Sequence, residues 1–265
     1  MGDDIQMNLP TQLPPSVDKA VENLTDKPTE VIGRGVAAIV SLVFSPIIHL
    51  SDKQQAKYLR NLEIYKQEIN SKIAAIPDEN YIEPKLQIAA QALEDSKYCI
   101  EEPDLREMFA NLIASASDKT KVEAVHPSFS AILRQMSPRD AAVMRMIKQG
   151  VGKYSNRFPV ATIKSKLLDN KGEISLAKNV IVPDLSDITK IINQDSLSSL
   201  LAFGLIDIDY SKHMASEGAY EHFERFAEAT GYKTQAENLN GILSIGKGNC
   251  ELTVYGQNFA RSCGL

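Results

Sequence analysis

The stretch from Val31 to Leu50, VIGRGVAAIVSLVFSPIIHL, decides how the fold is built, because so apolar a segment needs a place away from water. No residue from Gly35 to Ser51 carries a formal charge, and as a helix these positions would extend ~26 Å. That length falls just short of the ~30 Å hydrocarbon core of a bilayer, and starting at Val31 nearly closes the gap. The stretch therefore predicts a helix that is apolar nearly all round, placed in a protein core or in lipid.

Small side chains recur at every fourth position of this stretch and form a stripe that another helix could approach closely. Large apolar side chains cover the other side, and Pro46 ends or kinks the helix. Two interpretations stay open: an ordinary core helix, whole or broken at Pro46, or a helix that touches lipid constantly or when triggered. The predicted membrane or helix-packing interface consists of Gly33, Ala37, Val40, Ser41, Phe44 and Ser45.

The composition of the 265 residues is that of a globular protein, with 43% hydrophobic and 24% charged residues. A net charge of -5 gives no basic field, so we expect no nonspecific nucleic-acid binding. The three cysteines are odd in number and lack CxxC spacing, which argues against a disulfide framework and for a reducing compartment. The acidic start Met1 to Asp4 is unlike a signal peptide. We expect a cytoplasmic protein that is peripheral or integral at the inner membrane if the apolar stretch contacts lipid.

After Ser51 a long helix is predicted through Ile76, with charged residues around one apolar stripe. The stripe and the preceding apolar stretch together predict a helical hairpin. A coiled-coil seam is the alternative, although the pattern lasts fewer than four heptads. The stripe consists of Tyr58, Leu62, Tyr65, Ile69, Ile73 and Ile76.

Four prolines, Pro84, Pro103, Pro127 and Pro138, punctuate the chain up to Gly150 where apolar helical patterns begin. Proline suits the first helical position because its missing N–H would have no intrahelical partner there. The sequence therefore predicts a compact block of short helices packed on the long one.

Three motifs in this block resemble those of a known family. They are EPDLREMFANL at Glu102 to Leu112, HPSF at His126 to Phe129, and SPRDA from Ser137. With the apolar stretch and the charged helix ahead of them, they resemble the Abi-alpha family of bacterial proteins, named after abortive infection, a form of phage defence, over residues 30–150. The resemblance implies a bacterial origin and a role in defence, and it brings no catalytic mechanism or binding site.

The turn-rich segment from Gly150 to Pro159 predicts a domain boundary. Beyond it, two helices, a strand, a further helix, a hairpin around the turn Gly246-Lys247-Gly248-Asn249 and a last helix resemble a winged-helix domain. We therefore expect a mainly α fold: an N-terminal helical bundle with a central apolar helix, then a small α+β winged-helix-like domain. The predicted domains are an arm with a short helix at 1–28, a helical domain at 29–150 and the winged-helix-like domain at 151–265. Within the last, helices are expected at 185–193, 194–203, 217–230 and 255–263, strands at 205–210, 241–245 and 250–254, and a short helix or strand at 160–168.

No catalytic, cofactor-binding or metal-ligating motif is present. His213 and His222 lack metal-ligand spacing, so zinc is unlikely there, and His126 has no partner motif beside it, so a structural role is its stronger interpretation. Asp207 and Asp209 share one strand face and could bind a cation, but a solvated face suits them better. Within the EPDLREMFANL motif, Arg106 and Glu107 are expected to form surface pairs, and Pro127 and Phe129 of HPSF to start and pack a helix.

These observations predict an antiphage protein of the abortive-infection type that is not an enzyme and needs no cofactor. Its apolar helix would be shielded at rest and would reach inner-membrane lipid or a self-associating interface during infection. A homo-oligomer or a protein partner is expected, nucleic acid is unlikely as a partner, and no small-molecule substrate is identified. The alternative is a soluble sensor or regulator whose winged-helix-like domain binds a protein partner or DNA.

Overall fold

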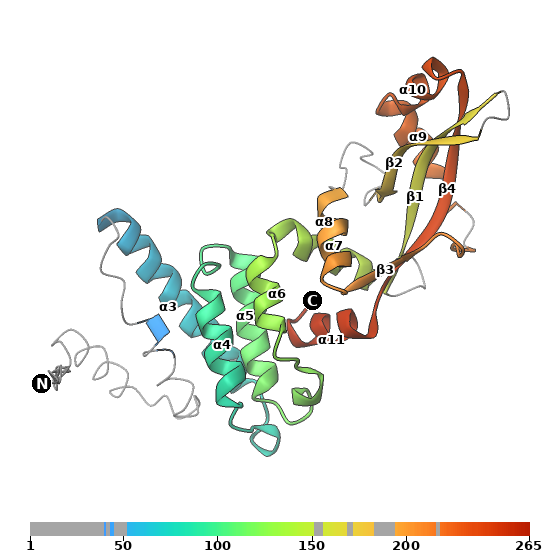
Figure 1. The fold of residues 1–265 in the computed structure, drawn as a ribbon. Coiled ribbons are helices and arrows are strands. Elements are labelled where there is room, and N and C mark those ends of the chain that lie inside the picture. Colours follow the sequence, from blue (N-terminus) through green and yellow to red (C-terminus); the bar gives the residue numbers. More distant parts are fainter. Residues whose placement is uncertain are drawn as a thin grey trace, which may run out of the picture.

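The computed structural model describes Val40, Val43, Phe44 and residues 52–150, 156–168, 172–182, 194–215 and 218–265. A group of helices lies at one end of the elongated molecule and an antiparallel sheet extends to the other (Figure 1). The fold is mixed α+β: the helical group was expected, but the four-stranded sheet makes the chain less predominantly α than the mainly α fold that we expected. The first helices are α3 (Asp52–Ala74), α4 (Leu86–Ser96), α5 (Pro103–Ala116), α6 (Phe129–Gln135) and α7 (Pro138–Gln149).

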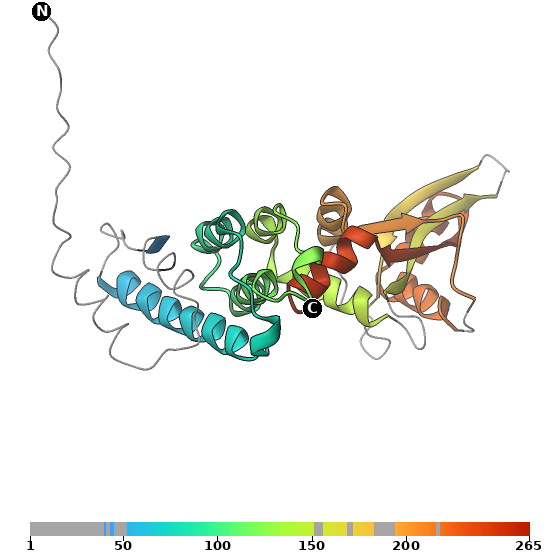
Figure 2. The same cartoon turned by 90° about the horizontal axis from the view of Figure 1, so that it is seen from below.

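The predicted long helix is α3, and its apolar stripe faces the core. Tyr65, Ile69 and Ile73 are almost completely buried, and α3 packs chiefly against α5. Figure 2 shows α3 lying along the outside of the helical group. The apolar residues at spacings of three and four therefore form a stripe that packs against the core of this chain.

Two of the four prolines lie where helices start, and the other two lie two residues before the helix start. Pro103 and Pro138 occupy the first turns of α5 and α7. Ser137 and Asp140 complete a capping box, in which the Asp140 carboxylate accepts the Ser137 N–H at 2.8 Å and the Asp140 N–H donates to the Ser137 hydroxyl at 3.2 Å. After Pro84 and Pro127, by contrast, α4 and α6 begin only at the second residue beyond the proline.

The second half of the chain forms a four-stranded antiparallel sheet in the order β2-β1-β4-β3. Strands β1 and β4 pair along their whole shared length, from Arg157 opposite Glu251 to Leu167 opposite Gly241. Helices α9 and α10 cover the far part of the sheet (Figure 1). The elements are β1 (Arg157–Leu167), β2 (Glu173–Val180), α8 (Gln194–Ala202), β3 (Ile206–Asp209), α9 (Glu221–Ala229), α10 (Tyr232–Asn238), β4 (Gly241–Leu252) and α11 (Val254–Ser262).

The predicted hairpin around residues 246–249 is wrong, because these residues lie in the middle of the single strand β4. The glycines have packing roles there. A Cβ on Gly248 would lie only 2.6 Å from the Tyr210 ring, and one on Gly246 would lie 3.1 Å from the Lys164 side chain. Glycine inside a strand often marks such a close approach, and a turn interpretation from composition alone misses it.

Several other elements predicted for this half are present, although β2 and α10 were not predicted. Residues 194–203 and 205–210 contain α8 and β3, and residues 255–263 contain most of α11. The ambiguous segment 160–168 is strand β1, and the helix expected at 217–230 is shorter, as α9. The helix expected at 185–193 and the N-terminal arm lie outside the described residues.

Two clusters of buried apolar side chains make up the described core. The larger includes Val40 and Phe44, side chains of α3 to α8 and of α11, and the near end of the sheet, where Phe158, Cys250 and Leu252 belong to it. The smaller joins the far end of the sheet to α9 and α10 around Phe223 and Phe226. The large cluster thus crosses residue 150, and the division of the chain into domains there stays a prediction.

Ion pairs join α3 to α5. The Arg106 guanidinium donates to both Glu68 carboxylate oxygens at 3.1 to 3.2 Å and to the Ile100 carbonyl at 3.1 Å. The Arg106 side chain is only 9% exposed, so the predicted surface pair is a buried one, while Glu107 pairs with Lys72 as expected nearer the surface. A buried two-bond pair of this kind fixes the orientation of the helices as well as their contact.

Replacing Arg106 by alanine is expected to lower the free energy of unfolding by about 3 kcal/mol, because the Glu68 charge would keep little solvent and no cation. The matched control is Lys57→Ala, which removes a more exposed partner of Glu101 and should cost less than ~1 kcal/mol. Urea unfolding of both variants measures the difference. Equal losses of unfolding free energy would show that the buried pair stabilises the fold no more than the exposed pair does.

Replacing Gly248 by alanine is expected to cost about 1 to 3 kcal/mol of unfolding free energy, because the new methyl group would overlap the Tyr210 ring. In a Tyr210→Ala background the additional cost should fall below about 1 kcal/mol. Thermal and urea unfolding of the two single variants and the double variant provide the measurement. An unchanged cost in both backgrounds would exclude the ring as its cause.

Candidate functional site

The predicted interface in the apolar stretch is represented in the structure by Val40 and Phe44. Both side chains are buried, 6% and 7% exposed, and belong to the large core cluster. The Phe44 ring meets the ring of Tyr65 of α3 edge to face, with 6.2 Å between centroids. The other predicted interface residues, Gly33, Ala37, Ser41 and Ser45, lie outside the described residues. Both side chains are thus part of the core, and that of Phe44 packs on α3.

Tyr65 provides the surface on which Phe44 rests. It lies at the centre of the α3 stripe, has no exposed area, and burial raises the pKa of its hydroxyl strongly. Phe44 therefore contacts a fixed, fully buried ring. Within the part of the chain that the structure describes, no helix has both the length and the apolar character to span a membrane.

The family-like motifs gather around α11 at the end of the chain. The hydroxyl of Ser128, from HPSF, is hydrogen-bonded to the hydroxyl of Tyr255 and lies 2.7 Å from Nδ1 of His126. His126 Nδ1 also accepts the backbone N–H of Ser128 at 3.2 Å. The imidazole thus fixes the turn that leads into α6, which agrees with the structural role expected for it.

Two polar residues of α5 that the sequence did not single out bind the last turn of α11. The Asn111 amide donates to the Cys263 carbonyl at 3.1 Å, and the Ser115 hydroxyl donates to the Ser262 carbonyl at 2.9 Å. Their spacing of four residues puts them on one face of α5. Two polar residues four apart in the apolar second half of α5 were the available sequence signal for this contact. Buried carbonyl groups at the end of a helix need hydrogen-bond donors, and such residues can supply them.

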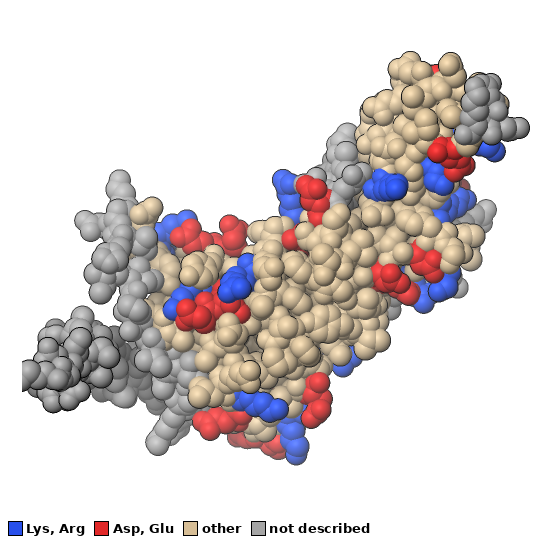
Figure 3. Space-filling model, in the orientation of Figure 1, with Lys and Arg blue, Asp and Glu red and all other residues tan. Residues whose placement is uncertain are grey.

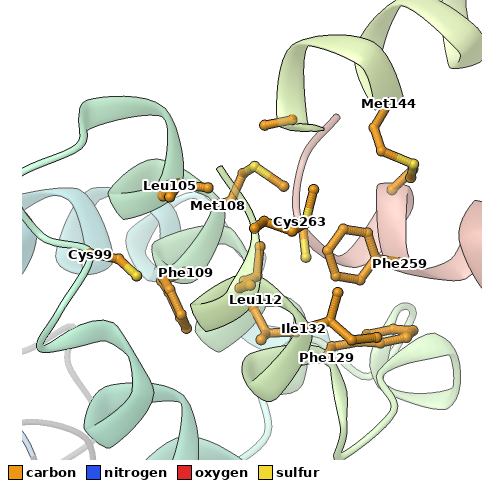
Figure 4. Packing of buried hydrophobic residues seen from close by; sticks show 14 of the residues in the cluster. Cys99, Leu105, Met108, Phe109, Leu112, Phe129, Ile132, Met144, Phe259 and Cys263 are labelled. Atoms are coloured by element: carbon orange, nitrogen blue, oxygen red, sulfur yellow. The ribbon is translucent and has the colours of Figure 1, made fainter. Parts of the chain in front are cut away.

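Aromatic packing completes this contact (Figure 4). The Phe129 ring lies 5.2 Å from that of Phe259 and 5.1 Å from that of Tyr255, measured between centroids. Figure 4 shows Phe259 and Cys263 among side chains of α5 and α6, including Leu112 and Ile132. Phe129 therefore packs as predicted, and its partners come from a helix more than a hundred residues later in the chain.

The titratable groups show no activated nucleophile among the described residues. Cys99, Cys250 and Cys263 are all buried, and burial raises the pKa of each thiol, that of Cys250 to about 12. A thiol with a raised pKa stays protonated at neutral pH and reacts poorly. These cysteines therefore have the environment of structural residues.

The acidic pair on β3 is exposed and locally satisfied. Hydrogen bonds from the Ser211 hydroxyl and N–H, with Lys212 nearby, lower the pKa of Asp209 to about 2. Asp207 lies across from Glu251 of β4, which in turn pairs with Arg157. No group of three or more His, Cys, Asp or Glu side chains in the described part of the chain is placed to hold a metal ion.

Charged residues are mixed over the surface in Figure 3, where acidic and basic side chains lie in small neighbouring groups. Helix α8, in the segment 194–203 of the predicted winged-helix-like domain, has the sequence QDSLSSLLA and contains no Lys or Arg. Phosphate contacts need such cations. On this face the described surface has no extended basic patch.

His222 on α9 is the one imidazole of the described residues whose two ring nitrogens are both buried without a hydrogen-bond partner. Its residue is 4% exposed and its ring lies 4.2 Å from that of Phe223. Burial, and secondarily the charge of Arg225, lowers the pKa of His222 from 6.5 to about 4. The imidazole is therefore neutral in the folded protein at neutral pH.

This burial predicts acid sensitivity. Below pH 6.5 the unfolded chain binds a proton at His222 that the folded protein does not bind until about pH 4, so stability falls as the pH falls through that window. At pH 5 the loss should be about 2 kcal/mol. Urea unfolding at pH 7 and pH 5 measures it, with His222→Leu as the comparison. If the unsubstituted protein and His222→Leu lose the same unfolding free energy between pH 7 and pH 5, the interpretation of His222 as a neutral buried imidazole is wrong.

Comparison with known proteins places the chain in a family. Searches of curated proteins and of solved structures find no significant match. A family model described as abortive infection alpha matches residues 57–263, from the first turns of α3 to the end of α11. The match extends beyond the predicted resemblance at 30–150 into the whole sheet region, and it leaves the apolar stretch at 31–50 outside. Because it covers most of the chain, the protein belongs to the abortive infection alpha (Abi-alpha) family.

Proposed function

We propose that this protein acts in phage defence by abortive infection, without catalysing a reaction, through the apolar stretch at 31–50. Family membership supports the defence role. The observation that carries the mechanism is the burial of Val40 and Phe44, with the Phe44 ring against Tyr65 of α3. An apolar segment held in this way is kept from water at rest, and its release would expose a surface suited to lipid or to another helix.

The position of the stretch relative to the family match supports this assignment. The matched region begins at residue 57, so the apolar segment precedes the part that the family model describes. In our proposal the matched helices and sheet detect infection and hold the segment, and the segment acts on the inner membrane. The small-residue stripe favours self-association of copies of the chain, through Gly33, Ala37, Ser41 and Ser45.

We do not favour the alternative of a winged-helix regulator that binds DNA. The residues expected to form its hairpin belong to the interior of β4, and α8 has no basic side chain. Both features would be needed for the usual docking of such a domain on a duplex.

The proposal predicts that Val40→Asp or Phe44→Asp abolishes protection of a bacterial culture against phage, because a carboxylate at either position opposes contact with lipid or a helix. Leu59→Asp on α3 is the matched control, since Leu59 is an apolar residue already 54% exposed, and it should protect normally. Plaque counts measure protection, and circular dichroism confirms that each variant is folded. Full protection by folded Val40→Asp and Phe44→Asp proteins would refute the mechanism.

Fractionation of infected and uninfected cells tests the location directly. Full-length protein should move to the membrane fraction after infection, and a deletion of residues 29–51 should stay in the cytosol. If the full-length protein remains in the cytosol under both conditions while it still protects, the apolar stretch is core and the effector mechanism is wrong.

A further inference from the structure

A hollow of about 330 Å³ lies between β4 and the start of α9, away from α3 and the apolar stretch. Its volume is at the lower end of the roughly 300 to 1,000 Å³ that small-molecule sites occupy. The described residues that give it polar character are His213, Tyr220, Glu221, Glu224 and Lys247. Lys247 belongs to the Gly-Lys-Gly-Asn segment that we expected to be a turn, and the strand instead directs it to this hollow.

Tyr220 gives the hollow a fixed wall. Its side chain is buried, its hydroxyl donates to the Gly248 carbonyl at 2.7 Å, and the same hydroxyl accepts the N–H of Met214 at 2.9 Å. These two bonds tie the segment before α9 to β4 and hold the ring in place. A wall fixed before binding lowers the entropy cost of holding a ligand.

Lys247 and the two glutamates bring opposite charges to this space without neutralising one another. The Lys247 ammonium lies 5.5 Å from the centre of the Tyr220 ring, and none of the described carboxylates is within ion-pair distance of it. Glu221 and Glu224 lie in the first turn of α9, are exposed, and likewise form no ion pair with a described cation. The three charged side chains therefore line one hollow without forming an ion pair with one another.

We propose that the hollow binds a free α-amino acid. Its carboxylate would meet Lys247 and its ammonium group would meet Glu221 and Glu224, so that each charge of the ligand faces an opposite charge on the wall. A simple anion would also face two carboxylates, and a simple cation would also face the lysine. A zwitterion of amino-acid size is the ligand class that avoids both repulsions.

The test is calorimetric titration of the full-length protein with each of the twenty common L-amino acids at up to about 10 mM. At least one should bind saturably. For the tightest, the analogue lacking the amino group and the analogue lacking the carboxylate should each bind at least tenfold more weakly.

Variants assign the binding to the hollow. Lys247→Met and Glu224→Gln should each raise the Kd of the tightest amino acid at least tenfold. Lys166→Met should leave it unchanged, because Lys166 is exposed on β1 and alternates with Ser165, which faces α10. Circular dichroism shows whether each variant is folded. Failure of all twenty amino acids to bind, or a Kd that folded Lys247→Met leaves unchanged, overturns the proposal.

Discussion

The hydrogen bonds from α5 to the last turn of α11 join the helical group to the helix that follows the sheet. Asn111 and Ser115 satisfy the carbonyls of Cys263 and Ser262, and the Ser262 hydroxyl in turn donates to the carbonyl of Ala124. Strand β4 leads into α11 through Thr253, whose hydroxyl accepts the N–H of Gly256 as the helix cap. Because β4 pairs with both β1 and β3, fixing α11 also fixes the sheet against the helices.

Local signals in the sequence were enough to predict most of the helices. The stripe of α3 repeats over about four turns, from Tyr58 to Ile73, and the capping box of α7 lies within four consecutive residues, so neither depends on distant parts of the chain. The predicted hairpin in β4 failed for the opposite reason. Whether Gly248 ends a strand or lets Tyr210 approach it depends on a residue just beyond the end of β3, and that information is not local.

The same distinction explains what could be predicted of the functional residues. Val40 and Phe44 stood out because a long uncharged stretch is visible in any sequence, whereas the roles of Asn111 and Ser115 depend on partners about 150 positions away. Arg106 was expected at the surface because arginine usually lies there, and Glu68 of α3 compensates its charge in the interior. The hollow beside Lys247 is assembled from β4 and the segment before α9, and no single motif describes it.

The contact between α5 and α11 also sets an order of events during synthesis. Ser115 and Ser262 are 147 positions apart, and bacterial-type elongation at about 5 to 20 residues per second separates them by roughly 7 to 30 s. During that interval the apolar face of α5 around Leu112 and Phe109 lacks the helix that covers part of it in the finished fold. The nascent helical group therefore keeps this apolar face exposed for longer than its own synthesis takes, and apolar surface exposed during synthesis favours aggregation.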